Sequence, residues 1–396
     1  MRKFFIVFLC ILGVLHLSAQ DFEKDRIEFS LLTCSPSTEV YALYGHTAIR
    51  YHNATTGDDW AFNYGVFDFG APNFVWRFVK GECDYQLGVI PYYYMEQEYR
   101  QRGSAVYAQV LNLTAQEKER LFDLLMTNYQ PENRVYRYNF LYDNCTTRAR
   151  DRIEEAVEGE IHYPEKTTSL TYRQIIHQYT QNAPWAEVGQ DLCLGQEADE
   201  PLTQRQEMFA PFYLKDYFSG AAICSVDGNE RPLVLREETL VPLPAATKNT
   251  GKLLWRCLTP GWVAFVLLVV VLFLGWFQLK QNKIYWGVDL FTQLTVGLMG
   301  CIVTILFFFS VHPTVGSNWQ ILLFNPLPLF LIPWTIGCAV RRKRTFIHVF
   351  YAVWMVIVLV TLSLISQKNS MPSYVLACIL LIRSIGYILY YKKNKN

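Results

Sequence analysis

Five long apolar segments fill the C-terminal third of the chain and constrain its fold more than any other feature. Each has about 20 residues, the length that an α-helix needs to cross the hydrocarbon core of a bilayer. The third is the least regular, because Pro326, Pro328 and Pro333 interrupt it. The sequence therefore predicts a transmembrane domain of five helices at 251–396. The expected spans are Pro260–Leu279, Val288–Ser310, Trp319–Val340, Phe346–Ser366 and Ser373–Tyr391.

The first residues have the pattern of a cleaved secretory signal peptide. Arg2 and Lys3 precede an apolar run at 4–15, and small residues follow before position 20. A retained membrane anchor is the alternative, although the apolar run is short for a span. We therefore expect a signal peptide at 1–19, followed by an exported domain at 20–250.

Basic residues are concentrated in alternate connections of the membrane domain. If the exported domain faces outward, the inward segments contain Lys280, Lys283, the run 341–344 and the C-terminal lysines, whereas the outward loops contain only Lys368. Because positive residues are enriched on the cytoplasmic side, this pattern predicts a cytoplasmic C-terminus. The formal net charge of +1 and the lack of a basic patch in the sequence exclude nucleic acid as an expected partner.

The outward domain is expected to have an α+β fold. Residues 27–111 alternate and are rich in β-branched and aromatic side chains, which is typical of short antiparallel strands. Thr114 and Glu117 have the spacing of a capping box, which predicts a helix beginning there. The other expected elements are a strand at 135–141, a helix from Cys145, helices at 171–181 and 203–217, a loop at 184–202, and a hairpin or linker at 225–259.

The exported domain contains an odd number of cysteines, so four can pair in an oxidising compartment and leave one thiol. These cysteines are Cys34, Cys83, Cys145, Cys193 and Cys224. The sequence has no CxxC motif and no Cys/His cluster with zinc spacing. We therefore expect neither a metal site nor a cofactor.

Cys145 lies in YDNCTTRARD, at the start of a predicted helix, where the partial positive charge of the helix N-terminus favours the thiolate. A nucleophilic cysteine also needs a base, usually histidine. His46 lies in YALYGHTAIRYH, a strand-like segment in which Gly45 allows another backbone to approach closely. Either residue alone is more often structural, but the pair indicates a cysteine-nucleophile site.

GHTAIRY, WAFNYGVFDF and YNFLYDNCTTRARD together resemble the circularly permuted papain-like fold of the NlpC-like superfamily. In that arrangement the histidine-bearing strands precede the cysteine-bearing helix. The signal peptide, the DLCLGQEAD and MFAPFYL segments and the multi-span tail extend the resemblance to the Lnb-type family of Gram-negative envelope proteins. That family is associated with N-acylation of bacterial lipoproteins.

The resemblance implies that Cys145 is the nucleophile and His46 the general base. Asn63 in AFNYG best fits the residue that orients the histidine, and His52 and Asp68 are its rivals. The additional candidates for substrate binding are Tyr44, Asn144, His312, Asn318 and Asn325. The last three lie in the proline-rich outward segment at 310–326, which either forms a lipid-headgroup site or is a kinked helix whose polar groups are satisfied internally.

The implied protein is a multi-pass enzyme of the inner membrane with its N-terminal domain in the periplasm. It would move an acyl chain from a phospholipid, through a Cys145 thioester, to the N-terminal amine of a diacylglyceryl-cysteine lipoprotein. Two alternatives remain open on sequence alone. One is an NlpC-like cell-wall peptidase or amidase, and the other is a non-enzymatic envelope sensor or assembly factor.

Overall fold

The computed structural model describes residues 26–68, 70, 72–166, 169–225, 227–244 and 258–394. The predicted signal peptide at 1–19 lies outside these residues. The described residues fall into two compact units, which we treat separately. The first unit comprises 26–74, 83–169 and 202–244, and the second comprises 75–82, 170–201 and 258–394. The predicted domain boundary at residue 250 stays a prediction, since these units are defined by packing and interleave along the chain.

A seven-stranded antiparallel sheet forms the centre of the first unit, with strand order β10-β5-β1-β2-β3-β4-β6. Five of these strands lie within residues 27–111, where the sequence predicts strands. That prediction was wrong for Val40–Ala42, a 3-10 helix, and for Phe74–Lys80 and Tyr92–Arg102, which are α-helices. The strands are β1 (Ile27–Cys34), β2 (His46–Asn53), β3 (Asp59–Val66), β4 (Asp84–Pro91), β5 (Val106–Leu111), β6 (Val135–Arg137) and β10 (Val234–Val241).

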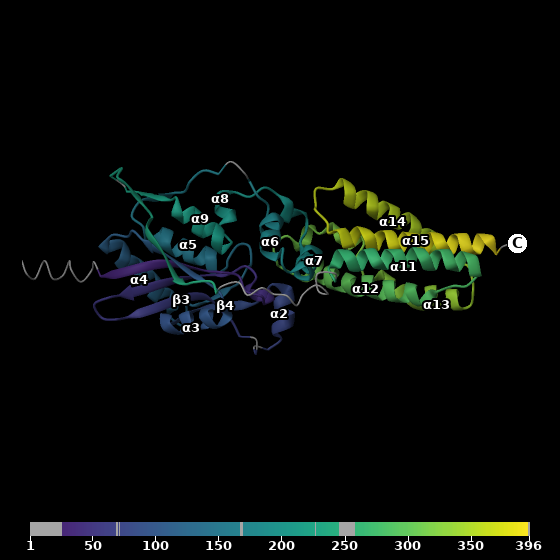
Figure 1. Ribbon diagram of the computed structural model, residues 1–396, viewed down its shortest axis with the longest axis horizontal. Helices are drawn as coiled ribbons and strands as arrows, with labels where there is room; N and C mark the ends of the chain where they lie inside the picture. Colours follow the sequence, from purple (N-terminus) through teal and green to yellow (C-terminus); the bar gives the residue numbers. More distant parts are fainter. Residues whose placement is uncertain are drawn as a thin grey trace, which may run out of the picture. The chain divides into compact units, whose positions relative to one another are not determined.

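Helices cover both faces of this sheet (Figure 1). One face packs against α3 (Tyr92–Arg102), and the other packs against α4 (Ala115–Tyr129), α5 (Cys145–Ala156) and α9 (Pro211–Ser219). Strand β1 shows why both faces are buried. Phe29 and Leu31 join the core beneath α4 and α5, whereas Leu32 and Cys34, on the opposite face, join the core beneath α3.

Several predicted elements of the first unit have different bounds in the structure. The capping box of Thr114 and Glu117 is formed. The helix expected at 203–217 is two helices, α8 (Gln204–Glu207) and α9, because Pro211 lacks an N–H and begins a new helix. The strand expected at 135–141 is limited to β6. A small second sheet contains β7 (Glu160–His162), β8 (Ala222–Cys224) and β9 (Glu230–Pro232).

The second unit contains five helices that are long and apolar enough to cross a membrane, as the sequence predicts. Prolines shape the third span, in which a short 3-10 helix, Trp319–Leu322, comes before the α-helix Leu327–Val340. Another 3-10 helix, Val315–Ser317, lies just before the span. The spans are α11 (Pro260–Gln281), α12 (Trp286–Phe309), Trp319–Val340, which includes α13 (Leu327–Val340), α14 (Ile347–Leu364) and α15 (Met371–Lys393).

The second unit also includes α6 (Tyr172–Thr180) and α7 (Pro184–Cys193), and residues 75–80 of α2 (Phe74–Lys80). The prediction of a loop at 184–202 was therefore wrong for its first half. Proline at the first helical position is favourable, because the N–H it lacks would have no intrahelical acceptor there. Glu187 in the first turn further stabilises the helix through its dipole.

Candidate active site

The three predicted catalytic residues lie on neighbouring strands and at the start of a helix, positions that bring them together. His46 is the first residue of β2, Asn63 belongs to the neighbouring strand β3, and Cys145 is the first residue of α5. Thr47 Oγ1 lies 3.0 Å from Thr146 Oγ1, and this buried contact ties the start of β2 to the start of α5. The histidine and the cysteine are therefore held by adjacent backbone rather than by long loops.

Asn144 fixes the N-terminus of α5. Its Oδ1 accepts hydrogen bonds from the N–H groups of Thr146 (2.8 Å) and Thr147 (3.0 Å). Its Nδ2 donates to the carbonyl oxygens of Phe140 and Phe209. Since the side chain is only 4% exposed and both amide atoms are used, Asn144 positions Cys145 in this structure. Its predicted contact with substrate stays a prediction.

His46 Nε2 lies 2.8 Å from Asn63 Oδ1. The N–H of Gly65 donates to the same oxygen at 2.8 Å, so the amide oxygen, and not its NH₂ group, must face the imidazole. Asn63 Oδ1 therefore accepts a hydrogen bond from the protonated Nε2 of His46. The other ring nitrogen, Nδ1, is then the one available to interact with Cys145.

The two rivals of Asn63 do not make this contact. His52 lies six residues further along the same extended strand as His46, about 20 Å away at the usual rise per residue. Asp68 is exposed and its Oδ1 accepts a hydrogen bond from the N–H of Gly70. The structure thus brings only Asn63, of the three candidates, to the imidazole of His46.

Two glycines make room for the histidine. A Cβ on Gly65 would lie 2.7 Å from His46 Cε1, closer than van der Waals contact allows. Gly45 has φ +75°, and a Cβ there would lie 2.3 Å from the carbonyl oxygen of Cys34. The close backbone approach predicted at Gly45 is therefore present. Sequence reasoning missed Gly65, although its place two residues after Asn63 in AFNYG was the available signal.

Cys145 and His46 each favour the charged form of the other. Burial alone would raise the pKa of the Cys145 thiol, but the charge of His46 and a hydrogen bond with it outweigh burial and lower the pKa to about 7. Burial opposes protonation of His46, yet the thiolate and the hydrogen bonds to Cys145 and Asn63 raise its pKa. Both shifts favour a thiolate on Cys145 and a proton on His46, the direction expected for a reactive cysteine.

The lowered pKa predicts early alkylation of Cys145. Because only the thiolate reacts, the rate of labelling by iodoacetamide should rise through pH about 7, rather than near the ordinary thiol pKa of 9.0. Peptide mapping by mass spectrometry over a pH series measures this rate for each cysteine. Cys224 is the internal control, since burial and Glu230 raise the pKa of its thiol. Equal midpoints for the two thiols would contradict an activated Cys145.

The other predicted site residues have local structural contacts. The ring of Tyr44 packs edge-on against Phe140 at 4.7 Å between centroids, in the first unit. His312 Nε2 lies 2.6 Å from the carbonyl oxygen of Phe78, within the second unit. Asn318 Nδ2 donates to the carbonyl oxygen of Leu192. The predicted substrate-binding roles of these residues stay predictions.

Asn325 Nδ2 donates to the carbonyl oxygens of Ile321 and Leu322. Its Oδ1 accepts from the N–H of Leu327, the first residue of α13. The amide therefore bridges the proline-rich break and the helix that follows. Its predicted role in lipid binding also stays a prediction.

A possible metal-ligating group lies apart in sequence from all these residues. His162, Cys224 and Glu230 each bring one ligand atom to within 4.8 Å of the others on the small sheet. Strand pairing places Cys224 opposite Glu230, a juxtaposition that residue spacing alone does not reveal.

Among the described residues, Cys34, Cys145, Cys193 and Cys224 lack disulfide bonds, so the odd cysteine count does not single out Cys145.

The fold and the site define an integral membrane protein whose α+β domain carries a cysteine–histidine–asparagine group. The chain matches two family models, the Lnb N-terminal periplasmic domain over residues 16–178 and the Lnb transmembrane domain over residues 252–395. It therefore belongs to the Lnb family, as a multi-pass inner-membrane protein with a periplasmic N-terminal domain. No curated protein and no solved structure showed significant similarity to the chain.

Proposed function

We propose that this protein is a lipoprotein N-acyltransferase that works through a thioester on Cys145. The observation that carries the proposal is the grouping of Cys145 at the start of α5 with His46 and Asn63, inside the segment that matches the Lnb periplasmic domain. In this group the pKa of Cys145 is lowered and that of His46 is raised. The five apolar helices add a reason for a lipid substrate, since a hydrolase of the cell wall needs at most one anchor.

The order of the site residues along the chain supports a permuted papain-like arrangement. His46 and Asn63 are on strands β2 and β3, and Cys145 begins the helix α5 that follows them. An asparagine orients the imidazole without adding a charge, as in other cysteine–histidine–asparagine sites. The proposed roles are therefore nucleophile for Cys145, acid and base for His46, and orientation of His46 for Asn63.

In the first half-reaction, Cys145 Sγ attacks the ester carbonyl of a phospholipid acyl chain. The carbonyl electrons move to oxygen, and the tetrahedral intermediate then collapses to the thioester as the C–O bond breaks. The imidazolium of His46 gives its proton to the departing lysophospholipid oxygen. The step ends with acyl-Cys145, neutral His46 and a lysophospholipid.

In the second half-reaction, the α-amine of a diacylglyceryl-cysteine lipoprotein attacks the thioester. His46 accepts a proton from the amine nitrogen as the C–N bond forms, and the C–S bond then breaks. The products are an amide on the lipoprotein and the restored thiolate–imidazolium pair. A thioester suits this task because it reacts readily with amines.

The N-terminus of α5 supplies a donor for the negative oxygen of both intermediates. Asn144 accepts from Thr146 and Thr147, but the N–H of Cys145 itself has no acceptor among the described residues. It is the first N–H of the helix, so it lies at the N-terminus, where the helix dipole is positive. A donor of this kind typically contributes a hundredfold or more in rate.

The proposal predicts a change in lipoprotein N-termini. Cells that lose the gene should accumulate lipoproteins with a free α-amine, and cells with the gene should carry an amide-linked chain. Mass spectrometry of N-terminal lipopeptides measures the difference, and peptidoglycan fragments from the same cells test the cell-wall alternative. Unchanged acylation together with altered peptidoglycan would replace the acyltransferase with an NlpC-like hydrolase. If Cys145→Ser restored normal N-termini, the role would be non-enzymatic.

The proposed topology places the C-terminus in the cytoplasm, because the basic residues 341–344 and 392–393 follow spans that would then end inside. Both lipid substrates would be presented in the outer leaflet of the inner membrane. The proposed partners are thus a phospholipid donor, a diacylglyceryl lipoprotein acceptor and the membrane itself.

A further inference from the structure

Helix α2 exposes apolar side chains, although it lies within the match to the periplasmic domain. Val75 is 74% exposed, Trp76 is 51% exposed and Phe78 is 48% exposed. Every residue of α2 is at least partly exposed. Single exposed apolar residues are ordinary on a protein surface, but adjacent large ones typically mark a surface that contacts another molecule.

The apolar side chains of α2 lie on one side of the helix. Val75, Phe78 and Val79 have the i, i+3 and i+4 spacing of a single helical face, and Trp76 extends that face. By the same periodicity Arg77 lies on the opposite side, where its guanidinium donates to a backbone carbonyl oxygen at 2.9 Å. An apolar face with an aromatic ring, opposite a basic side, is typical of a helix that lies in the interface of a bilayer.

Residues 75–82 pack in the second unit, against the end of the membrane helix α12. The N–H of Val311 donates to the carbonyl oxygen of Lys80 at 2.9 Å. His312 Nε2 lies 2.6 Å from the carbonyl oxygen of Phe78, and the two rings pack edge-on with 5.8 Å between their centroids. Helix α2 is therefore attached to the residues that directly follow α12.

Gly81 lets the chain turn directly after α2. Its φ is +75°, in the left-handed region that favours glycine, and a Cβ there would lie 3.0 Å from the backbone nitrogen of His312. Lys80 Nζ and Glu82 Oε1 form an ion pair at 2.7 Å across the turn. A larger residue at position 81 would push α2 away from the end of α12, so the sequence itself supports this contact.

The end of α12 lies at the outer surface of the membrane. The helix has 24 residues, and at the usual rise it is about 36 Å long, enough to cross the hydrocarbon core. Because α2 belongs to the periplasmic match, the end that it contacts is the periplasmic one. Phe308, Phe309 and Val311 at this end are 65%, 63% and 65% exposed. The apolar face of α2 thus adjoins the lipid-facing surface of α12 at the level of the headgroups.

Other tryptophans lie at the same level of the membrane. Trp262 in the first turn of α11 is 57% exposed, and Trp319 at the start of the third span is 44% exposed. Both spans begin on the side where α12 ends, since successive spans alternate in direction. Tryptophan is enriched at this level because its ring is amphipathic, so Trp76 fits an outer belt of such residues.

We propose that α2 is an interfacial helix whose apolar face, with Val75, Trp76 and Phe78, lies among the lipids of the outer leaflet of the inner membrane. Its opposite side, with Arg77, faces the headgroups and water. A lipid surface suits this face better than a protein, because it adjoins residues of α12 that are themselves exposed to lipid. Since α2 connects β3 to β4, the membrane holds the periplasmic domain at a point far in sequence from the first span.

Site-specific photocrosslinking in the full-length protein tests this placement. The photoreactive residue p-benzoylphenylalanine replaces Trp76, Phe78 or Arg77, one position at a time, in membranes of the producing cells. Mass spectrometry after irradiation identifies the adducts. We expect adducts to phospholipid acyl chains at positions 76 and 78 and their loss at position 77, the matched control on the other side of the same helix. Heating each purified variant checks that it is folded.

Fluorescence quenching supplies a second measurement that keeps the apolar face nearly intact. Trp76→Phe removes one indole and keeps an aromatic ring, so it should fold like the wild type. The difference between wild type and variant isolates the emission of Trp76. In nanodiscs this emission should be quenched by a phospholipid brominated on its acyl chains, and only weakly by iodide in the water.

Protein adducts in place of lipid adducts at positions 76 and 78 would overturn the proposal and assign this face to a protein partner. Acyl-chain adducts at all three positions would also overturn it, because they would place α2 inside the bilayer rather than at its surface. Quenching of Trp76 by iodide alone would place it in water. Neither measurement involves acyl transfer, so lipid contact at α2 in a protein that transfers no acyl chain would refute the proposed function alone.

Discussion

Cys145→Ser should reduce acyl transfer by roughly a thousandfold or more, the scale seen when a covalent nucleophile is disabled. A large share of Cys145 is thiolate near neutral pH because its pKa is lowered to about 7, whereas a serine hydroxyl must lose its proton during the attack. The measurement is transfer of a radiolabelled acyl chain from phospholipid to a diacylated lipopeptide by the purified protein in mixed micelles. The acyl-enzyme itself is detected as label on the protein that neutral hydroxylamine releases.

The matched control is Cys224→Ser, the same substitution at another half-buried cysteine of the same unit. It should leave both the rate and the hydroxylamine-sensitive label unchanged. Asn63→Ala should give an intermediate loss with the thioester still detectable, because it frees the imidazole of His46 without removing the nucleophile. Full transfer by Cys145→Ser, or label on the protein that hydroxylamine cannot release, would refute the thioester mechanism.

The elements that the sequence predicts best depend on local signals. The capping box of Thr114 and Glu117 and the five apolar spans need only residues that are close in the chain, and both are present. The same holds for Cys145 at the first position of α5, where Asn144 is a strong N-cap residue. Local hydrogen bonding and hydrophobic length are thus readable before the fold is known.

The choice among Asn63, His52 and Asp68 could not be made from local signals. It depends on how β2 pairs with β3 and on the irregular register of β3 against β4 between Asn63 and Val66. A one-residue shift of a strand sends its side chains to the other face, so residue type alone does not determine the partner of His46. Gly65 is a partial indication that Asn63 is the partner of His46, because only a small residue fits beside the imidazole.

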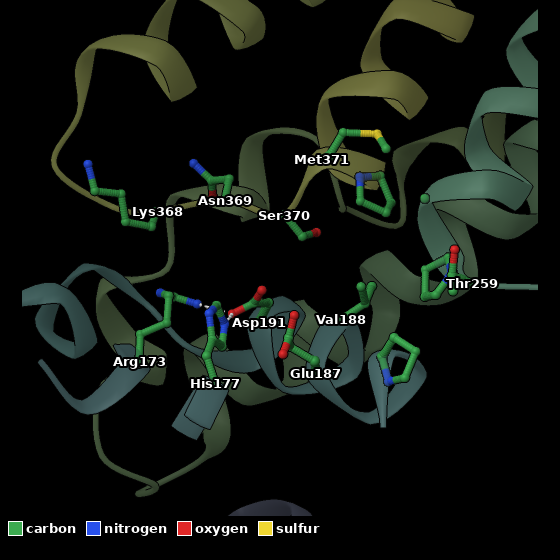
Figure 2. A pocket seen from close by; sticks show the side chains of 14 residues that line it. Arg173, His177, Glu187, Val188, Asp191, Thr259, Lys368, Asn369, Ser370 and Met371 are labelled. Atoms are coloured by element: carbon green, nitrogen blue, oxygen red, sulfur yellow. Dashed lines mark hydrogen bonds and ion pairs between the residues drawn. The ribbon is translucent and has the colours of Figure 1, made fainter. Parts of the chain in front are cut away.

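The sequence alone could not predict the cavity of about 290 Å³ that Arg173, His177, Asp191 and Lys368 line in the second unit (Figure 2), for a related reason. Arg173, His177 and Asp191 lie on two helices, one of which was expected to be a loop. Lys368 follows almost two hundred residues after Arg173 in the chain, and it counted only as the single basic residue of the outward loops. Clusters assembled from distant segments become visible only when helix packing is known.

The buried ion pair between α12 and α15 should dominate the stability of the membrane helices. Arg383 donates from Nε to Asp289 Oδ1 (2.6 Å) and from Nη2 to Oδ2 (2.7 Å). Tyr387 donates to the same carboxylate at 2.8 Å, and Gln278 of α11 accepts from Arg383. The two charged side chains are 4% and 8% exposed, so neither has water as an alternative partner.

Asp289→Leu should lower the free energy of unfolding by about 3–5 kcal/mol, because it leaves the guanidinium of Arg383 buried without a counter-charge. The double variant Asp289→Leu/Arg383→Met should lose much less than the single variant, since an apolar pair of similar volume avoids the cost of an unpaired charge. Heating the detergent-purified full chain and measuring the folded fraction by size-exclusion chromatography gives the order of stability.

Gln293→Leu is the control for these variants, because Gln293 is a buried polar residue of α12 that accepts a hydrogen bond from Thr335 and carries no charge. Its loss should be about 1 kcal/mol, as for an ordinary hydrogen bond, since Thr335 also donates to the carbonyl oxygen of Leu331. Rescue in the double variant would show that charge pairing, rather than the shape of either side chain, sets the stability. Additive losses from Asp289→Leu and Arg383→Met would instead mean that each residue stabilises the bundle independently, through Tyr387 and Gln278.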